Sequence, residues 1–302
     1  MSFLPQEFSQ YIAPETDRAD FIQKWLLDRG VKSNRIVLDG KNHILVQYES
    51  KFYNPQYRIK TVIAHYDRVE GSPGANDNSA ADFMLMKWAV ELQEYRTFHN
   101  VRIFFTDGEE LGWNTGVNEQ GAFALASTFK RLGIINDDVY VFDSCGRGEI
   151  PILSRSMLTQ KVPHRFRTQF EDLYERSEAL LKKASPNRWM TLPIPYSDNA
   201  SFLACGIPAV AITMLPAHEA ALYSRNLIND KNLESAVLNR ESSKSDRILG
   251  KVKDYGYKDR LPLTWRLFHT KDDDISSLTE VSFTVMDKIL RTLADSKTPC
   301  LL

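Results

Sequence analysis

Short apolar runs recur along the chain and predict buried strands. They occupy residues 43–48, 61–64, 101–106, 139–142 and 207–213. Each run is shorter than an ordinary helix and rich in β-branched or other apolar side chains, which is typical of strands covered on both faces.

Between these runs, apolar residues return every three or four positions and predict helices. The helical stretches lie at about 16–30, 80–92, 122–133, 166–181 and 281–293. Thr16 is placed to cap the first helix, and Gly30 is placed to end it.

Strands that alternate with helices predict an α/β fold, with a mixed, mostly parallel central sheet and helices on both faces. We therefore expect a three-layer sandwich. Residues 226–260 break the pattern, because they are polar and only weakly periodic. We interpret about 215–265 as a surface excursion from a single domain that spans residues 1–302.

Charge and composition narrow the classes of function. The 302 residues include 38 Lys and Arg against 39 Asp and Glu, so the formal net charge is −1. This balance gives no reason to expect a nucleic-acid or membrane partner. Residues 1–7 lack the basic and apolar regions of a signal peptide, and no stretch is apolar enough to cross a bilayer. We expect a cytoplasmic protein.

The cysteine count limits the choice of metal ligands. Cys145, Cys205 and Cys300 are too few and too scattered for a disulfide framework or a thiolate metal site. Any metal ion must therefore be held by nitrogen and oxygen.

Imidazoles and carboxylates follow several of the predicted strands, where loops bring ligands together in α/β sheets. They are His65, Asp67, Asp77, Glu109, Glu110, Asp143 and His269. A pair of zinc ions needs a bridging carboxylate and further nitrogen or oxygen ligands, and this set supplies both. Asp67, two residues after His65, is placed to hold the second ring nitrogen of that histidine.

Each of these residues alone has an ordinary structural explanation. Glu109 and Glu110 could complement a helix dipole, and Asp77 could cap a helix. Their joint placement after strands of one sheet is what favours a metal site.

Five motifs together resemble metallopeptidase family 28, the co-catalytic zinc aminopeptidases and their relatives the glutaminyl cyclases. They are His65-Tyr66-Asp67, the Gly-Ser-Pro-Gly-Ala-Asn-Asp-Asn stretch at 71–78, Glu109-Glu110-Leu111-Gly112, Asp143 and His269-Thr270. Ser197-Asp198 is a weaker match. The glycine-rich stretch combined with the paired glutamates is the most specific part of the pattern.

The resemblance implies a zinc-exopeptidase fold and a role for each residue. His65 and Asp143 would bind one zinc ion, Glu110 and His269 the other, and Asp77 would bridge both. Glu109 would be the general base acting on a zinc-bound water. A cis peptide would follow Asp77, and Asp198 would lie near the active site without a defined role. The expected activity is removal of the N-terminal residue from peptides with a free N-terminus.

Other readings remain open. A glutaminyl cyclase would use a single zinc ion and release ammonia from N-terminal glutamine. A catalytically decayed peptide-binding relative, or a di-zinc carboxypeptidase or deacylase, would share much of the scaffold. Nitrogen and oxygen ligation with two histidines suits zinc, and cobalt or manganese stay open as the metal used in cells. The sequence does not reveal the preferred N-terminal residue or the oligomeric state.

Overall fold

The computed structural model describes residues 3–110, 116–155, 158, 161–238 and 258–300. Within this part of the chain, eight strands form one mixed sheet with the order β1-β2-β4-β3-β5-β8-β6-β7. The strands are β1 (Ser33–Leu38), β2 (Lys41–Val46), β3 (Lys60–His65), β4 (Val101–Thr106), β5 (Asp138–Phe142), β6 (Ile150–Ser154), β7 (Met190–Leu192) and β8 (Ala209–Leu215). The central strands β4, β3, β5 and β8 run parallel, whereas β2 and β6 pair with that block in the antiparallel sense.

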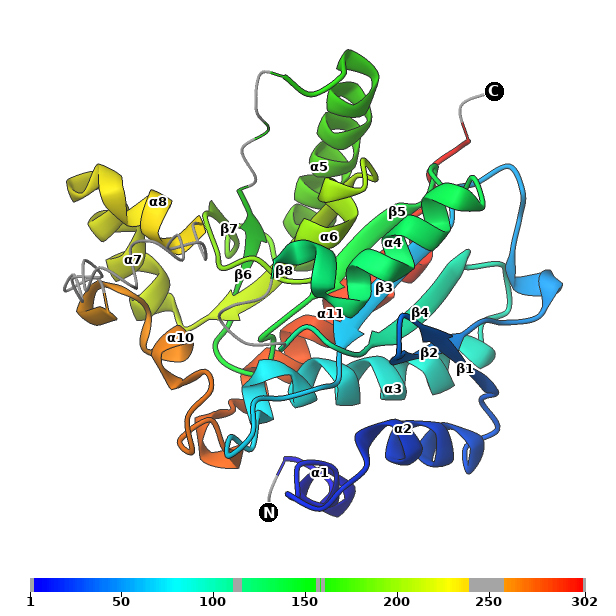
Figure 1. Cartoon of the computed structure of the whole chain (residues 1–302), viewed down its shortest axis with the longest axis horizontal. Coiled ribbons are helices and arrows are strands. Elements are labelled where there is room, and N and C mark those ends of the chain that lie inside the picture. Colours follow the sequence, from blue (N-terminus) through cyan, green and yellow to red (C-terminus); the bar gives the residue numbers. More distant parts are fainter. Residues whose placement is uncertain (1–2, 111–115, 156–157, 159–160, 239–257, 301–302) are drawn as a thin grey trace.

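Helices cover both faces of the sheet and complete the expected three-layer α/β fold (Figure 1). The described α-helices are α1 (Gln6–Tyr11), α2 (Arg18–Leu27), α3 (Ala80–Gln93), α4 (Gly121–Arg131), α5 (His164–Ala184), α6 (Asn199–Ala204), α7 (Ala217–Asn229), α8 (Lys231–Leu238), α10 (Leu263–Leu267) and α11 (Glu280–Asp295). Helices α3, α5 and α11 pack on one face, and α4, α6 and α7 pack on the other. None of the described helices has the length and apolarity needed to span a membrane.

Alternating side chains of the central strands feed two separate hydrophobic clusters. In β3, Val62 and Ala64 enter the cluster under α3 and α11, while Ile63 enters the cluster under α4 and α6. In β5, Tyr140 and Val141 divide in the same way. This period of two explains why the strand runs are continuously apolar, because both faces of the sheet are covered.

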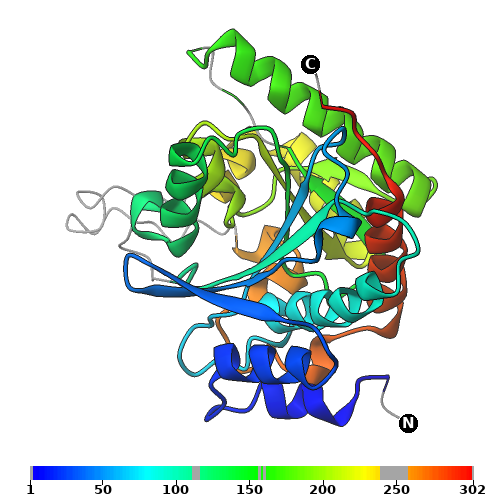
Figure 2. The same ribbon diagram turned by 90° about the vertical axis from the view of Figure 1, so that its right-hand side faces the viewer.

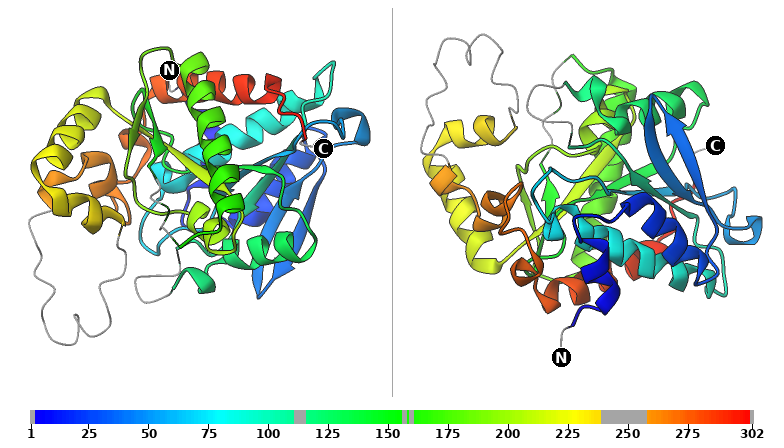
Figure 3. Two further views of the ribbon diagram at one scale, coloured as in Figure 1. Left: turned by 90° about the horizontal axis from the view of Figure 1, so that it is seen from above. Right: turned by 60° about the horizontal axis from the view of Figure 1, so that its bottom comes forward.

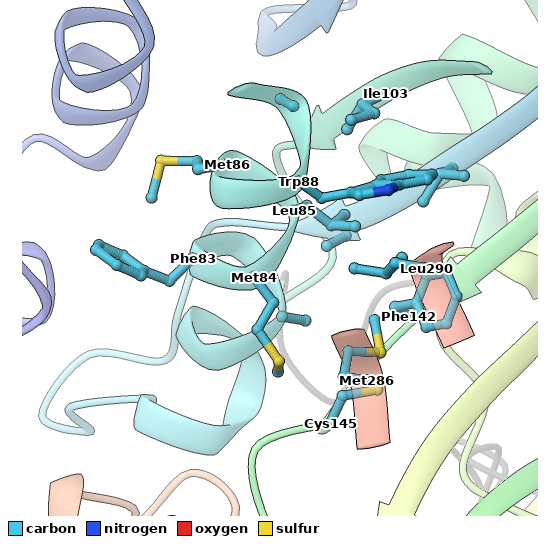
Figure 4. Close-up of a cluster of buried hydrophobic side chains, with 14 of the residues drawn as sticks. Phe83, Met84, Leu85, Met86, Trp88, Ile103, Phe142, Cys145, Met286 and Leu290 are labelled. Carbon is cyan, nitrogen blue, oxygen red and sulfur yellow. The ribbon is translucent and has the colours of Figure 1, made fainter. Parts of the chain in front are cut away.

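Helix α3 is buried over most of its surface, with Lys87 exposed. Leu85 and Trp88 point toward the sheet, and Phe83 points away from it (Figure 4). The ring of Phe83 lies 5.6 Å from the ring of Trp25 on α2. Helices α1 and α2 accordingly lie along the outer side of α3 (Figure 2). This central helix carries the residues that directly follow Asp77, so its packing fixes the position of that carboxylate.

The helix at 16–30 begins differently from the prediction. Asp17, not Thr16, is its N-cap, and the Asp17 carboxylate accepts the N–H of Asp20 at 2.9 Å. The helix starts at Arg18, one residue too late for Thr16 to cap it, and the Thr16 hydroxyl donates instead to the carbonyl of Gln10. The other predicted strands and helices are present with small shifts in their bounds.

The polar segment contributes more to the core than its composition indicated. Helices α7, α8 and α10 gather at the end of the sheet farthest from the β1–β2 hairpin (Figure 3). Tyr223, Leu233 and Trp265 from this segment are buried in the cluster under α4 and α6. Residues 239–257 of the predicted excursion lie outside the described residues.

Candidate active site

Three neighbouring parallel strands deliver the first group of candidate residues. His65 is the last residue of β3, Glu109 and Glu110 follow β4, and Asp143 directly follows β5. Because β4, β3 and β5 are adjacent and parallel, their carboxyl ends share one edge of the sheet. The expected convergence of these residues is therefore built into the strand order.

Asp77 reaches this edge from the turn that precedes α3. Gly74 has φ of 59° and no room for a side chain, because a Cβ there would lie 2.6 Å from the Asp77 carbonyl oxygen. The Asp77–Asn78 peptide is cis, as the family resemblance implied. Asp273 accepts the backbone N–H groups of Asn76 at 2.9 Å and of Asp77 at 3.0 Å, which anchors the turn.

Asp77 lies between the two histidines and faces each with a different oxygen. Its Oδ1 is 3.4 Å from His65 Nε2, and its Oδ2 is 3.4 Å from His269 Nε2. Asp143 Oδ2 lies 3.8 Å from His65 Nε2, and Glu110 Oε1 lies 2.9 Å from His269 Nε2. The structure therefore brings all five predicted ligands into two groups that share Asp77, and a third group places Glu109 with His65 and Glu110.

The donor atoms around His65 fit a metal ion. Both ring nitrogens of His65 are buried without a hydrogen-bond partner in the described structure. Buried polar atoms are rarely left unpaired, since desolvation without a partner is costly. Zinc bonds of about 2.0–2.2 Å at tetrahedral angles separate neighbouring donor atoms by roughly 3.3–3.6 Å. The gap of 3.4 Å between His65 Nε2 and Asp77 Oδ1 matches that separation.

Asp67 organises the turn that carries the paired glutamates. Its carboxylate accepts the backbone N–H of Glu109 at 3.2 Å and that of Glu110 at 2.8 Å. Its Oδ1 lies 3.6 Å from His65 Nδ1, on the side of the ring away from Asp77. Burial would raise the pKa of Asp67, but His65 and the N–H groups of Glu110 and Glu109 outweigh burial and lower it. Leu111 and Gly112 of the same motif lie outside the described residues.

Carboxylates outnumber histidines at this edge of the sheet, which also favours a bound cation. Burial disfavours charge on His65, yet Asp143, Asp67 and Asp77 hold its pKa well above the usual value. Asp77 and Glu110 raise the pKa of His269 to about 10. Burial and the neighbouring Asp77 raise the pKa of Glu110 to about 8. Protons are thus retained at positions where a bound cation would supply the positive charge instead.

Comparison with known proteins decides the family. The sequence profile of peptidase family M28 matches residues 46–294, which is most of the chain. The chain belongs to peptidase family M28. Membership of a peptidase family supports the prediction that the protein is a hydrolase. No curated protein matches the chain in sequence.

Several solved structures share the fold of this M28 protein at low sequence identity. The LapA aminopeptidase of Legionella pneumophila is 15% identical, with a TM-score of 0.62, covering 95% of this chain and 68% of its own. A glutaminyl cyclase of Porphyromonas gingivalis is 14% identical, with a TM-score of 0.59, covering 95% and 94%. A Zn-dependent exopeptidase of Parabacteroides distasonis is 12% identical, with a TM-score of 0.60, covering 96% and 96%.

A cleft opens beside the candidate ligands of the M28 site. Its acidic lining residues are Asp77, Glu109, Glu110 and Asp143, and its polar ones are Ser144, Ser197 and Thr213. Its apolar lining residues are Ile194, Pro195, Trp265 and Phe268. The lining of the cleft therefore combines acidic and apolar side chains.

Asp198 lies behind the site. It is completely buried, and one of its carboxylate oxygens accepts a hydrogen bond from the hydroxyl of Thr106, the last residue of β4. Burial raises its pKa to about 7, and the nearby Glu109 acts in the same direction. Asp198 is not among the residues that line the cleft.

Several residues at the site were not found from the sequence. Asp273 belongs to the acidic run after His269, but its role depends on a contact with the distant Asp77 turn. Trp265 lies at the end of the predicted excursion, and Phe268 directly precedes His269, but neither belongs to a recognisable motif. Gln120 carried no signal at all, and its contact with Glu109 appears only in the folded chain.

Proposed function

We propose that the chain is a two-zinc aminopeptidase that hydrolyses the first peptide bond of peptides with a free N-terminus. The observation that carries the proposal is the position of Asp77, whose two carboxylate oxygens face two separate histidines at equal distances of 3.4 Å. A carboxylate in this position suits a bridge between two ions. His65 and Asp143 would complete one site, and Glu110 and His269 the other.

The two zinc ions would supply a Lewis acid for the peptide carbonyl and make water more acidic. Glu109 lines the cleft beside these ligands and is 5% exposed. Its carboxylate would take a proton from the attacking water and return it to the nitrogen of the leaving amine. Asp67 would hold Glu109 and Glu110 in place through its hydrogen bonds to both backbone N–H groups.

The acidic wall of the cleft supports exopeptidase rather than endopeptidase action. The four carboxylates of this wall match the charge of two zinc ions, so the α-ammonium of a substrate would be attracted by individual carboxylates, above all by Glu109, which is not a proposed metal ligand. An internal peptide segment has no such charge and would have to place an amide against the acidic wall. The preference for a free N-terminus would thus arise from Glu109 and the carboxylates that bind the metal ions.

A glutaminyl cyclase is the second candidate, because the P. gingivalis cyclase covers 94% of its own length in the comparison. Cyclisation by a single zinc ion would need only one of the two ligand groups that share Asp77. The orphaned ring nitrogens of buried His65 favour an ion in the group that contains His65 as well, and hence the two-zinc reading.

One experiment separates these candidates. The purified protein would be incubated with short peptides that differ in their first residue, and the products followed by mass spectrometry. The same reactions would be run after chelation and after zinc is restored, with bound zinc counted by elemental analysis. Stepwise loss of N-terminal residues that needs two zinc ions per chain is the expected result. Ammonia loss confined to peptides beginning with glutamine would replace the proposal with a cyclase.

A further inference from the structure

Gln120 occupies the N-cap position of α4 but does not cap the helix. Its backbone is extended, with φ of −69° and ψ of 146°, and its side chain makes no capping hydrogen bond. The side-chain amide Nε2 donates instead to two oxygens of Glu109. The distances are 3.2 Å to the carbonyl oxygen and 3.4 Å to carboxylate Oε1. The side chain of this N-cap residue is thus directed at the candidate general base and not at its own helix.

The orientation of the Gln120 amide follows from its partners. Both atoms on the Glu109 side are acceptors, so the NH₂ group must face them. On the other side, the Ser201 hydroxyl donates to Gln120 Oε1 at 3.2 Å. Ser201 lies on α6 and is completely buried. The amide is therefore held between the Glu109 turn and a fixed point on α6.

The backbone holds Gln120 close to Glu109. The N–H of Gly121 donates to the carbonyl of Gly108 at 3.1 Å. Gly121 lies so close to this turn that a Cβ would sit 1.8 Å from the carbonyl oxygen of Asp107. Only glycine allows this approach, which places the start of α4 directly against the turn that carries the paired glutamates.

We propose that Gln120 is a positioning residue for Glu109, and that Ser201 fixes the amide of Gln120. The hydrogen bond to Oε1 restrains the Glu109 carboxylate. Glu109 then stays directed at the attacking water and does not join Glu110 as a metal ligand. The inference rests on the proposed function, because it requires Glu109 to act as the base. It explains how two adjacent glutamates at the end of one strand keep different roles.

The test compares Gln120→Met with the wild-type chain, both loaded with zinc. Methionine keeps the length of the side chain and removes the donor. We expect kcat for N-terminal hydrolysis to fall roughly tenfold or more, the scale of one hydrogen bond to a charged group. KM and zinc stoichiometry should stay at the wild-type values, since substrate and metal binding do not use this hydrogen bond. The melting temperature should fall modestly, because the Glu109 carbonyl and the buried Ser201 hydroxyl also lose their partner.

Gln93→Met is the matched control. Gln93 also donates from its side-chain amide to a backbone carbonyl, that of Arg29 at 3.4 Å, but it lies at the far end of α3. This variant should keep the wild-type kcat. A fall in kcat equal to that of Gln120→Met would show a general effect of losing such an amide and would overturn the inference.

Ser201→Ala tests the second half of the proposal. It should lower kcat by a few-fold on its own and add nothing to Gln120→Met, because both changes act through one amide. An active wild-type chain with unchanged kcat in Gln120→Met would overturn the inference and leave the aminopeptidase proposal standing. A zinc-loaded wild-type chain that cleaves no peptide would overturn the proposed function, and this inference with it.

Discussion

At the scale of single residues, the central feature is that the adjacent glutamates Glu109 and Glu110 have different surroundings. Glu110 faces His269 at 2.9 Å, whereas Glu109 receives the amide of Gln120 and lines the cleft. Asp67 accepts the backbone N–H of both and so fixes the turn from which the two side chains diverge. Under the proposed function, Glu110 would bind metal and its neighbour Glu109 would move a proton.

Glu109→Gln tests this division of roles. The amide has nearly the size of the carboxylate but cannot accept the proton of water, so kcat should fall by about 10²–10⁴-fold. Zinc content and melting temperature should match the wild-type chain, because Glu109 is not a proposed ligand. Glu119→Gln, an exposed glutamate in the turn before α4, is the matched control and should retain full activity. Full activity in Glu109→Gln would remove this residue from the mechanism.

At the scale of elements, the sequence predicts the helices and strands whose hydrophobic pattern is strong. The central strands were predicted because coverage on both faces makes them continuously apolar. The edge strand β1 alternates weakly, and β7 has only three residues, so neither is predicted. The buried strand β6 is missed as well, because Pro151 interrupts its short apolar run. Charged neighbours dilute the buried side of α7 and α8, so the sequence there predicts a polar surface excursion.

The residues of the candidate site divide in the same way into those that the sequence predicts and those that it does not. Residues in dense local motifs, such as His65 and Glu109, could be predicted because the motif itself is specific. Gln120, Trp265 and Phe268 could not, since each acquires its role only through contacts with segments far away in the sequence. Ser201, for example, meets Gln120 across 81 positions.

The position of Trp265 on α10 predicts which substrates are preferred. Trp265 packs edge-on against Tyr223 of α7, with ring centroids 4.9 Å apart, and belongs with Phe268 to the apolar lining of the cleft. We expect peptides that begin with a large apolar residue to be the best substrates. Trp265→Ala should lower kcat/KM for them roughly tenfold, within the range for lost apolar contacts, and leave peptides beginning with alanine nearly unchanged.

Trp265→Phe serves as the control for α10, because it keeps an aromatic ring against Tyr223 and should retain most of the preference. The comparison uses variants whose zinc content and melting temperature match the wild type. A Trp265→Ala variant with the wild-type order of preference would show that this wall does not select the first residue.

At the scale of the whole molecule, the N-terminal helices support the loop that leads to Asp77. Arg18 donates to the carbonyls of Tyr66 at 2.9 Å and Pro73 at 2.8 Å. In return, Arg68 of that loop donates to the carbonyls of residues 12–14. Two arginines thus join the first two helices to the segment between His65 and Asp77. The site depends on parts of the chain that contribute no ligand to it.

Global stability should also depend on pH through a histidine far from the metal site. His99 is buried against the ring of Phe52 with 5.1 Å between centroids, and its Nδ1 accepts the N–H of Val101 at 3.0 Å. Burial, with a smaller effect of Lys60, lowers the pKa of His99 to about 3. In the unfolded chain the pKa returns to about 6.5, so below that pH the unfolded state binds a proton that the folded state refuses. The stability that neutral His99 contributes is therefore complete above about pH 6.5 and is lost as the pH falls toward 3.

His99→Gln removes this titration and keeps an acceptor for the Val101 N–H. Denaturant unfolding of the metal-free protein between about pH 7 and pH 5 should show a smaller loss of stability in the variant, by up to about 1.4 kcal/mol per pH unit at the acidic end. His43, whose pKa burial lowers to about 4, acts in the same direction and remains in both proteins. His164→Gln, a change at an exposed imidazole on α5, should keep the wild-type dependence. If His99→Gln also kept the wild-type pH dependence of stability, His99 would have to be protonated in the folded chain. The ring would then have to leave its aromatic surroundings.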